Sequence, residues 1–232
     1  MEEHYLRWSD ADLVEQFANK SIGEFFRTEQ WALEKMGGMF SSVLDIGCAS
    51  GRMVELLKSY TEQLSYTGID ISAENIECAR TAYPEAKFYL ANGLDFNPGA
   101  TYSLVNATGV CQHEPHFDVL VRRMIEMSCR FVMFDVKFAM LDQPLIDREQ
   151  SYCQFGEHRL FYVLLALRPF IKFMEMLPDI ACIEIWGYDT SPSSRAIVPS
   201  HIKRLVSAGV FIEKGNGPCR VKIDLPSWLE TA

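Results

Sequence analysis

Residues 43–51 constrain the fold more than any other segment, because a short apolar run leads directly into a turn of small residues. Val43, Leu44 and Ile46 are typical of a central strand that is covered on both faces. Residues 52–58 carry apolar side chains at helical spacing. Glycines in such a strand–turn–helix unit let backbone amides approach a ligand, and the N–H groups at the helix start add positive potential. The segment therefore predicts a site for a nucleotide or a similar polar cofactor.

Further strands and helices alternate along the chain. Apolar segments typical of strands occur at 64–71, 87–91, 103–107 and 130–136, and helical segments at 53–60, 75–80 and 117–127. This alternation predicts an α/β fold with a doubly wound, largely parallel sheet and right-handed crossovers.

The remaining segments are expected to add to this sheet. Residues 11–36 read as one or two amphipathic helices, either a layer packed on the sheet or a lid over the ligand. Residues 159–177 read as a kinked apolar helix, either a wall of the acceptor pocket or a core or dimer contact. The later segments are a strand at 180–186, a helix at 200–207 and an antiparallel hairpin of 210–214 with 219–225.

Composition limits the partners and the compartment. The chain has 232 residues and a net charge of −9, which fits one domain and disfavours a broad surface for nucleic acid. Its seven cysteines are scattered without a CxxC pair, so neither a disulfide scaffold nor a metal site is expected. The polar, acidic first residues and the short apolar run at 160–167 predict a cytoplasmic protein without a membrane span.

The spacing of the glycine turn excludes two cofactor classes. A dinucleotide fingerprint that starts at Gly47 needs a glycine at position 52, which is Arg52. A phosphate-binding P-loop needs Gly-Lys-Ser or Gly-Lys-Thr, which Gly51-Arg52-Met53 does not supply.

The pattern that remains, Asp45-x-Gly47-x-Ala49-x-Gly51, resembles the first motif of the class I, Rossmann-like S-adenosylmethionine-dependent methyltransferases. The resemblance extends to Asp70, where that family places the acid that binds the ribose hydroxyls. It also extends to residues 91–93, similar to the adenine-edge segment, and to residues 106–113, similar to the methyl-transfer segment. The resemblance implies S-adenosyl-L-methionine as the cofactor, bound by Asp45, Gly47, Cys48, Ala49, Gly51, Asp70, Ile71, Asn92, Gly93, Asn106 and Ala107. Ala49 replaces the usual middle glycine, which is tolerable if that residue avoids positive φ.

The family further implies a seven-stranded mixed sheet within a single domain, residues 1–232. Its parts would be an N-terminal helical cap (1–39), a cofactor-binding core (40–137), a substrate-side insertion (138–200), and a closing helix and hairpin (201–232).

The expected reaction is O- or N-methylation of a small molecule. His113 is the candidate general base because its ordinary pKa suits proton removal near neutrality. Weaker candidates are Glu114, His116, Asp135, Glu157 and His158. Cys48 and Cys111 are expected to be small buried residues rather than nucleophiles. The alternatives are a protein methyltransferase and a non-catalytic binding module with the same fold; a homodimer is also compatible with the apolar stretch.

Overall fold

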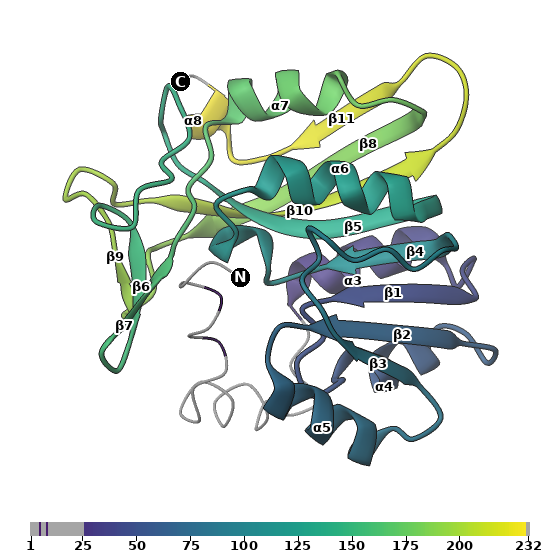
Figure 1. The fold of residues 1–232 in the computed structure, drawn as a ribbon. Coiled ribbons are helices and arrows are strands. Elements are labelled where there is room, and N and C mark those ends of the chain that lie inside the picture. The colour runs from purple at the N-terminus through teal and green to yellow at the C-terminus, as the bar shows by residue number, and fades with distance from the viewer. Residues whose placement is uncertain (1–4, 6–7, 9–25, 231–232) are drawn as a thin grey trace.

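The computed structural model describes residues 5, 8 and 26–230. Its main sheet has eight strands in the order β11-β8-β10-β5-β4-β1-β2-β3 (Figure 1). These strands are β1 (Ser42–Ile46), β2 (Ser65–Asp70), β3 (Lys87–Leu90), β4 (Tyr102–Ala107), β5 (Ser128–Phe138), β8 (Ile180–Thr190), β10 (Leu205–Lys214) and β11 (Arg220–Asp224). Strands β1 to β5 pair in parallel, and β10 runs antiparallel to both β5 and β8. The predicted doubly wound mixed sheet is confirmed.

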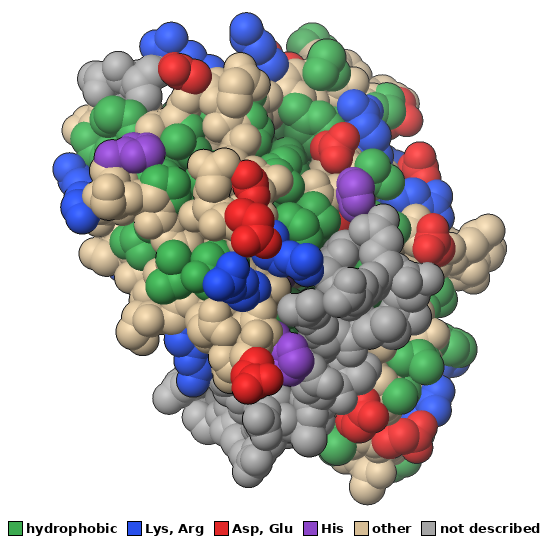
Figure 2. Space-filling view, turned by 60° about the vertical axis from the view of Figure 1, so that its left-hand side comes forward, with side chains coloured by type: hydrophobic (Ala, Val, Ile, Leu, Met, Phe, Trp, Pro, Cys, Tyr) green, Lys and Arg blue, Asp and Glu red, His purple; other side chains and the backbone are tan. Residues whose placement is uncertain are grey.

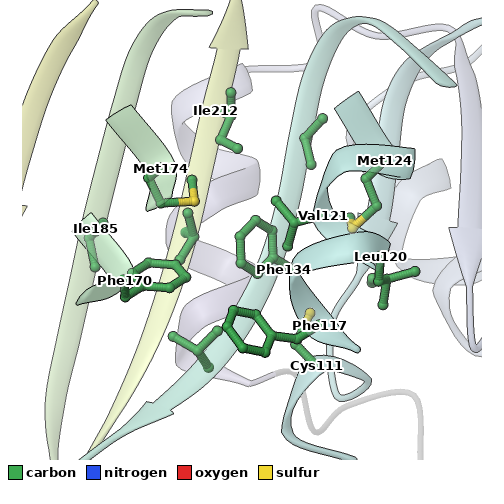
Figure 3. Packing of buried hydrophobic residues seen from close by; sticks show 14 of the residues in the cluster. Cys111, Phe117, Leu120, Val121, Met124, Phe134, Phe170, Met174, Ile185 and Ile212 are labelled. Carbon is green, nitrogen blue, oxygen red and sulfur yellow. The ribbon is translucent and has the colours of Figure 1, made fainter. Parts of the chain in front are cut away.

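Helices cover both faces of this sheet. They are α3 (Arg27–Met36), α4 (Met53–Lys58), α5 (Ala73–Ala82), α6 (Phe117–Met127), α7 (Leu167–Glu175) and α8 (Ser227–Glu230), with a 3-10 turn at Cys111–His113. α3, α4 and α5 pack on one face and α6 and α7 on the other. Figure 3 shows Phe134 of β5 between side chains of α6 and α7. Successive β1 residues Val43 and Leu44 belong to opposite faces, because side chains alternate along a strand.

The strand count and the predicted hairpin need correction. The sheet has eight strands rather than seven, because β11 adds an edge strand parallel to β8. β10 and β11 are not paired with each other, since β8 lies between them. Residues 215–219 are long enough to step across the end of β8, so the turn does not close a hairpin.

One predicted helix is wrong, and another is shorter than predicted. Residues 205–207 of the predicted closing helix begin β10, whose first eight residues are buried between β5 and β8. Residues 159–161 of the predicted apolar helix belong to β7, and the helix itself starts only at Leu167. An apolar run buried on all sides shows no period that separates helix from strand.

Residues 180–190 of the predicted insertion (138–200) are β8 of the main sheet, while other parts of it form a second, three-stranded sheet. Its strands are β6 (Tyr152–Phe155), β7 (His158–Phe161) and β9 (Ala196–Ile197), in the order β7-β6-β9. This sheet stands apart from the main sheet, on the left in Figure 1. The expected N-terminal helices are seen only as α3; residues 9–25 lie outside the described residues. Within the described part of the chain, no helix combines the length and apolar character needed to cross a membrane.

Candidate active site

A cavity of about 200 Å³ lies where β1, β2 and β4 end. Ligand sites in open α/β sheets occupy this position, because the loops at the carboxyl ends of the strands converge there. The cavity is lined by ten of the twelve predicted site residues: Asp45, Gly47, Cys48, Ala49, Asp70, Ile71, Asn92, Gly93, Asn106 and His113. Gly51 and Ala107 are not part of its lining.

The glycine loop has a strained backbone at Ala49. Gly47 and Gly51 have φ angles of 71° and 86°, which only glycine adopts without strain. Ala49 has a φ of 46° and is therefore in the left-handed region, so the condition under which its methyl group would be tolerated without strain is not met. A Cβ atom in this region costs about 1–2 kcal/mol. The loop tolerates this cost because its backbone is hydrogen-bonded on both sides.

Asp70 is one of the groups that hold the loop. Its Oδ2 accepts a hydrogen bond from the backbone N–H of Ala49 at 2.9 Å, and its Oδ1 accepts one from Ser72 N–H at 2.8 Å. Burial raises the pKa of Asp70, while these backbone donors act in the opposite direction. A carboxylate has about four lone-pair sites, so it can accept from two ligand hydroxyls as well.

Asp45 lies in a buried network between neighbouring strands. Its Oδ1 accepts a hydrogen bond from Nδ2 of Asn106 on β4 at 2.7 Å, and its Oδ2 accepts one from the hydroxyl of Tyr66 on β2. Burial raises the pKa of Asp45 to about 6, although both hydrogen bonds lower it. The network continues from Asn106 Oδ1 to the backbone N–H of Thr108, on the loop that also lines the cavity.

Asn92 and Gly93 form the turn after β3. Oδ1 of Asn92 accepts a hydrogen bond from Leu94 N–H at 2.9 Å, as in an Asx turn. A Cβ atom at Gly93 would lie 2.6 Å from Cγ2 of Ile46, so this position requires glycine for close packing. Both residues line the cavity. Since the turn uses Oδ1 of Asn92, the N–H₂ group of the same side chain is the donor that it could offer to a ligand.

His113 lies on the 3-10 turn after β4. Its Nδ1 is 2.7 Å from the carbonyl oxygen of Phe161, the last residue of β7. A carbonyl oxygen only accepts, so Nδ1 carries the proton and Nε2 is the basic nitrogen of the neutral ring. The backbone N–H of Val163 also donates to Gln112 O at 2.8 Å, so the insertion fixes this turn at two points.

The weaker candidates for a base are separated by the fold. Glu114 lines the cavity, whereas Asp135 is buried on β5, where it accepts a hydrogen bond from Gly109 N–H at 2.6 Å. Glu157, His158 and His116 are not among the lining residues. Cys48 and Cys111 are buried, and burial together with nearby carboxylates raises the pKa of each thiol. Both therefore stay protonated at neutral pH, which disfavours a nucleophilic role.

The structure adds an ion pair that the sequence reasoning did not identify. Nη2 of Arg52 is 2.7 Å from Oε1 of Glu29, and both residues line the cavity. Glu29 comes from α3 and Arg52 from the start of α4, so 23 positions separate them. The charge pattern alone gives no signal for such a pair.

Two aromatic residues from the start of the chain also line the cavity. The Tyr5 hydroxyl donates to the Glu114 carboxylate at 3.0 Å, and the Trp8 ring meets the His113 ring edge-on at 5.3 Å. Phe26, which directly precedes α3, lines the cavity as well.

Comparison with known proteins agrees with this geometry. Residues 43–128 match the family model described as a methyltransferase domain. Trans-aconitate 2-methyltransferase from Enterobacter sp. (strain 638) is 27% identical over 165 residues, 68% of this chain and 64% of that protein. The Sinorhizobium medicae enzyme of the same name is 35% identical over 81 residues, 35% of this chain and 32% of that protein. The first two curated relatives match over only 64% and 59% of their own length.

Solved structures share the fold over nearly the whole chain. The DhpI complex with S-adenosylhomocysteine has a TM-score of 0.60 at 14% identity, covering 93% of this chain and 97% of that one. Magnesium protoporphyrin IX methyltransferase from Synechocystis PCC 6803 has a TM-score of 0.57 at 11% identity, covering 93% and 98%.

The fold is that of the Rossmann-like, class I methyltransferases. Residues 43–128 are similar to a methyltransferase domain, and the solved structures that share the fold include complexes with S-adenosylmethionine and S-adenosylhomocysteine.

Proposed function

We propose that this chain methylates an oxygen or nitrogen atom of a small molecule. The observation that carries the proposal is that the glycine loop, Asp70, the Asn92 turn and His113 all line one cavity. When bound, S-adenosylmethionine supplies a methyl group on a sulfonium sulfur, which is a good leaving group. The protein then contributes mainly alignment, which is worth about 7–11 kcal/mol in favourable cases.

The cofactor contacts follow from the donors and acceptors that line the cavity. Asp70 would accept from the two ribose hydroxyls, and the Asn92 turn with Gly93 and Ile71 would border the adenine ring. The loop from Gly47 to Gly51, with Cys48 and Ala49, would meet the amino-acid end. Asp45, held by Asn106, would offer that end a negative charge. Gly51 and Ala107 would act through backbone shape, since neither lines the cavity.

The acceptor would approach past His113. With Nδ1 bonded to the Phe161 carbonyl, Nε2 would take the proton from an acceptor O–H or N–H group. Because Phe161 ends β7, the insertion at 138–200 would help to shape the acceptor side. The relatives support a small molecule, since their names specify trans-aconitate and magnesium protoporphyrin IX as what they methylate.

The surface supports a partner other than nucleic acid. The chain carries 31 acidic against 22 basic residues. On the face drawn in Figure 2, Lys and Arg side chains are interspersed with Asp and Glu. A nucleic-acid groove needs concentrated positive charge.

A cytoplasmic location is proposed with the function. All seven cysteines are free thiols, which suits a reducing compartment. We also propose a homodimer, in which the apolar stretch at 160–177 would form the contact between the two copies.

Isotope transfer tests the proposal against its alternatives. The protein is incubated with trideuteromethyl-labelled S-adenosylmethionine and a cell extract that has been separated into small-molecule and protein fractions. We expect labelled small molecules with wild-type protein, loss of label with Asp70→Ala, and no change with Asp118→Ala. Label confined to the protein fraction would favour a protein methyltransferase. No label in either fraction would favour a binding module.

A further inference from the structure

Tyr66 contacts the cavity only through another residue. It lies on β2, it is buried, and its hydroxyl donates to Oδ2 of Asp45 on the neighbouring strand β1. Tyr66 itself does not line the cavity, whereas Asp45 does. The hydroxyl is thus a donor in the core aimed at one cofactor-side carboxylate.

Both hydrogen-bond donors to Asp45 are neutral. Tyr66 provides an O–H group and Asn106 an N–H₂ group, one to each carboxylate oxygen. A buried carboxylate without a paired cation is costly to ionise, and donors to its oxygens favour the ionised form. The two donors therefore favour the ionised form of Asp45 and oppose the effect of burial.

The surrounding charges act in opposite directions. Arg52 at the start of α4 favours ionised Asp45, while Glu29 on α3 disfavours it. Asp45 in turn disfavours ionisation of the buried Cys48 thiol beside it, as does Asp70. Burial is the largest influence on Asp45, and the Tyr66 hydrogen bond is the largest one that opposes it.

We propose that Tyr66 is a positioning residue for cofactor binding: its hydroxyl orients the ionised Asp45 carboxylate to receive the α-ammonium group at the amino-acid end of the cofactor. The inference rests on the proposed function, because it needs the amino-acid end of the cofactor to lie beside Asp45. Tyr66 lies outside the cavity, and its contribution to cofactor affinity should therefore be visible only as a change in how that affinity depends on pH.

The test is calorimetric titration of the full-length protein with S-adenosylhomocysteine between pH 5.5 and 8.5. Affinity of the wild type should fall as the pH drops through about 6, where Asp45 gains a proton. Tyr66→Phe removes the donor, so this midpoint should rise by about one pH unit. Binding should then be about fivefold weaker than wild type at pH 6 and nearly equal at pH 8.5.

Two further variants separate this role from a structural one. Tyr89→Phe removes a hydroxyl from a tyrosine that is 45% exposed and should leave the curve unchanged. Asp45→Asn cannot titrate, so its weaker binding should lose the step near pH 6. A Tyr66→Phe curve that overlays the wild type, or that is lowered equally at every pH, would overturn the inference while leaving the proposed function intact. Absence of binding by the wild type at every pH would overturn both.

Discussion

The backbone N–H of Ala49 donates a hydrogen bond to Oδ2 of Asp70 at 2.9 Å. The acid at the end of β2 and the turn after β1 are therefore one structural unit, although 21 positions separate them. The same contact holds Ala49 at a φ of 46°, where a side chain is strained.

Substitutions at Ala49 should reveal this strain. Ala49→Val places a β-branched side chain at positive φ, so we expect unfolding to become easier by about 2 kcal/mol or more. It should also weaken S-adenosylhomocysteine binding, because the backbone contact to Asp70 shifts. Ala49→Gly keeps the N–H donor and relieves the strain, so its stability should equal or exceed that of the wild type. Urea unfolding measures the free energy of unfolding of the two variants. Equal stability of Ala49→Val and Ala49→Gly would show that the backbone at Ala49 is not strained.

Gly51 is required for a second reason in addition to its φ of 86°. A Cβ atom there would lie 2.9 Å from Cδ2 of Tyr83 and 3.2 Å from Cζ of Phe88. Gly51→Ala should therefore destabilise the fold by about 2–4 kcal/mol, from backbone strain and overpacking together.

Gly99→Ala is the matched control for Gly51. Gly99 has a φ of 69°, but its Cβ position has no atom within 4 Å. Gly99→Ala should therefore destabilise the fold only through backbone strain, by about 1–2 kcal/mol. Equal unfolding midpoints for the two variants would show that Tyr83 and Phe88 make room at no cost.

His113→Gln should separate turnover from cofactor binding. The substitution keeps a polar side chain but removes the basic nitrogen, so kcat for an acceptor that must lose a proton should fall about 10²–10⁴-fold. The dissociation constant of S-adenosylhomocysteine should change little. His201→Gln, at an exposed position, serves as the control. Unchanged kcat in His113→Gln would show that His113 is not the general base.

The buried Asp45 predicts a specific dependence of stability on pH. Its pKa is about 6 in the folded chain against 3.8 for the ordinary group, so the folded state binds a proton more readily than the unfolded state. The cost of ionising it is fully present above pH 6 and is lost as the pH falls from 6 towards 4. The difference between these pKa values corresponds to about 3 kcal/mol.

Asp45→Asn provides the comparison, because it cannot titrate. We expect the difference in unfolding free energy between wild type and Asp45→Asn to shift in favour of the wild type between pH 7.5 and 5. Urea unfolding at both pH values measures it. A difference that is independent of pH would show that Asp45 titrates normally.

The cofactor half of the fold could be predicted from the sequence because each element there has a local signal. The run before Gly47 predicts β1, Ser72 predicts the start of α5, and Phe117 to Met127 has the period of α6. Ser72 Oγ indeed accepts from Asn75 N–H as an N-cap.

The closing part of the fold has no such signal. Leu205 to Lys214 is buried on both faces, so its side chains show no alternation to separate strand from helix. The position of β8 between β10 and β11 depends on pairing across the sheet, which a local turn at Gly215 does not encode.

In the candidate site, too, some features could be predicted from the sequence and others could not. The residue types at Gly47, Asp70 and His113 could be read directly from the sequence, since each lies at the end of a strand or on the loop after it. The partners that tune them come from distant segments: Tyr66 for Asp45, Phe161 O for His113, and Glu29 for Arg52. Ala49 likewise has a left-handed backbone that its residue type does not favour, and its N–H group contacts the distant Asp70.

The affinity of the purified chain for S-adenosylhomocysteine, measured by calorimetry at pH 8, tests directly whether the cavity at the ends of β1, β2 and β4 is a cofactor site. We expect saturable binding with one site, and binding at least about tenfold weaker in Asp70→Ala, since two charge-assisted hydrogen bonds are lost. Asp118→Ala, on the first turn of α6, should bind like the wild type. Absence of binding, or equal affinity in wild type and Asp70→Ala, would show that Asp70 and this cavity do not hold the cofactor.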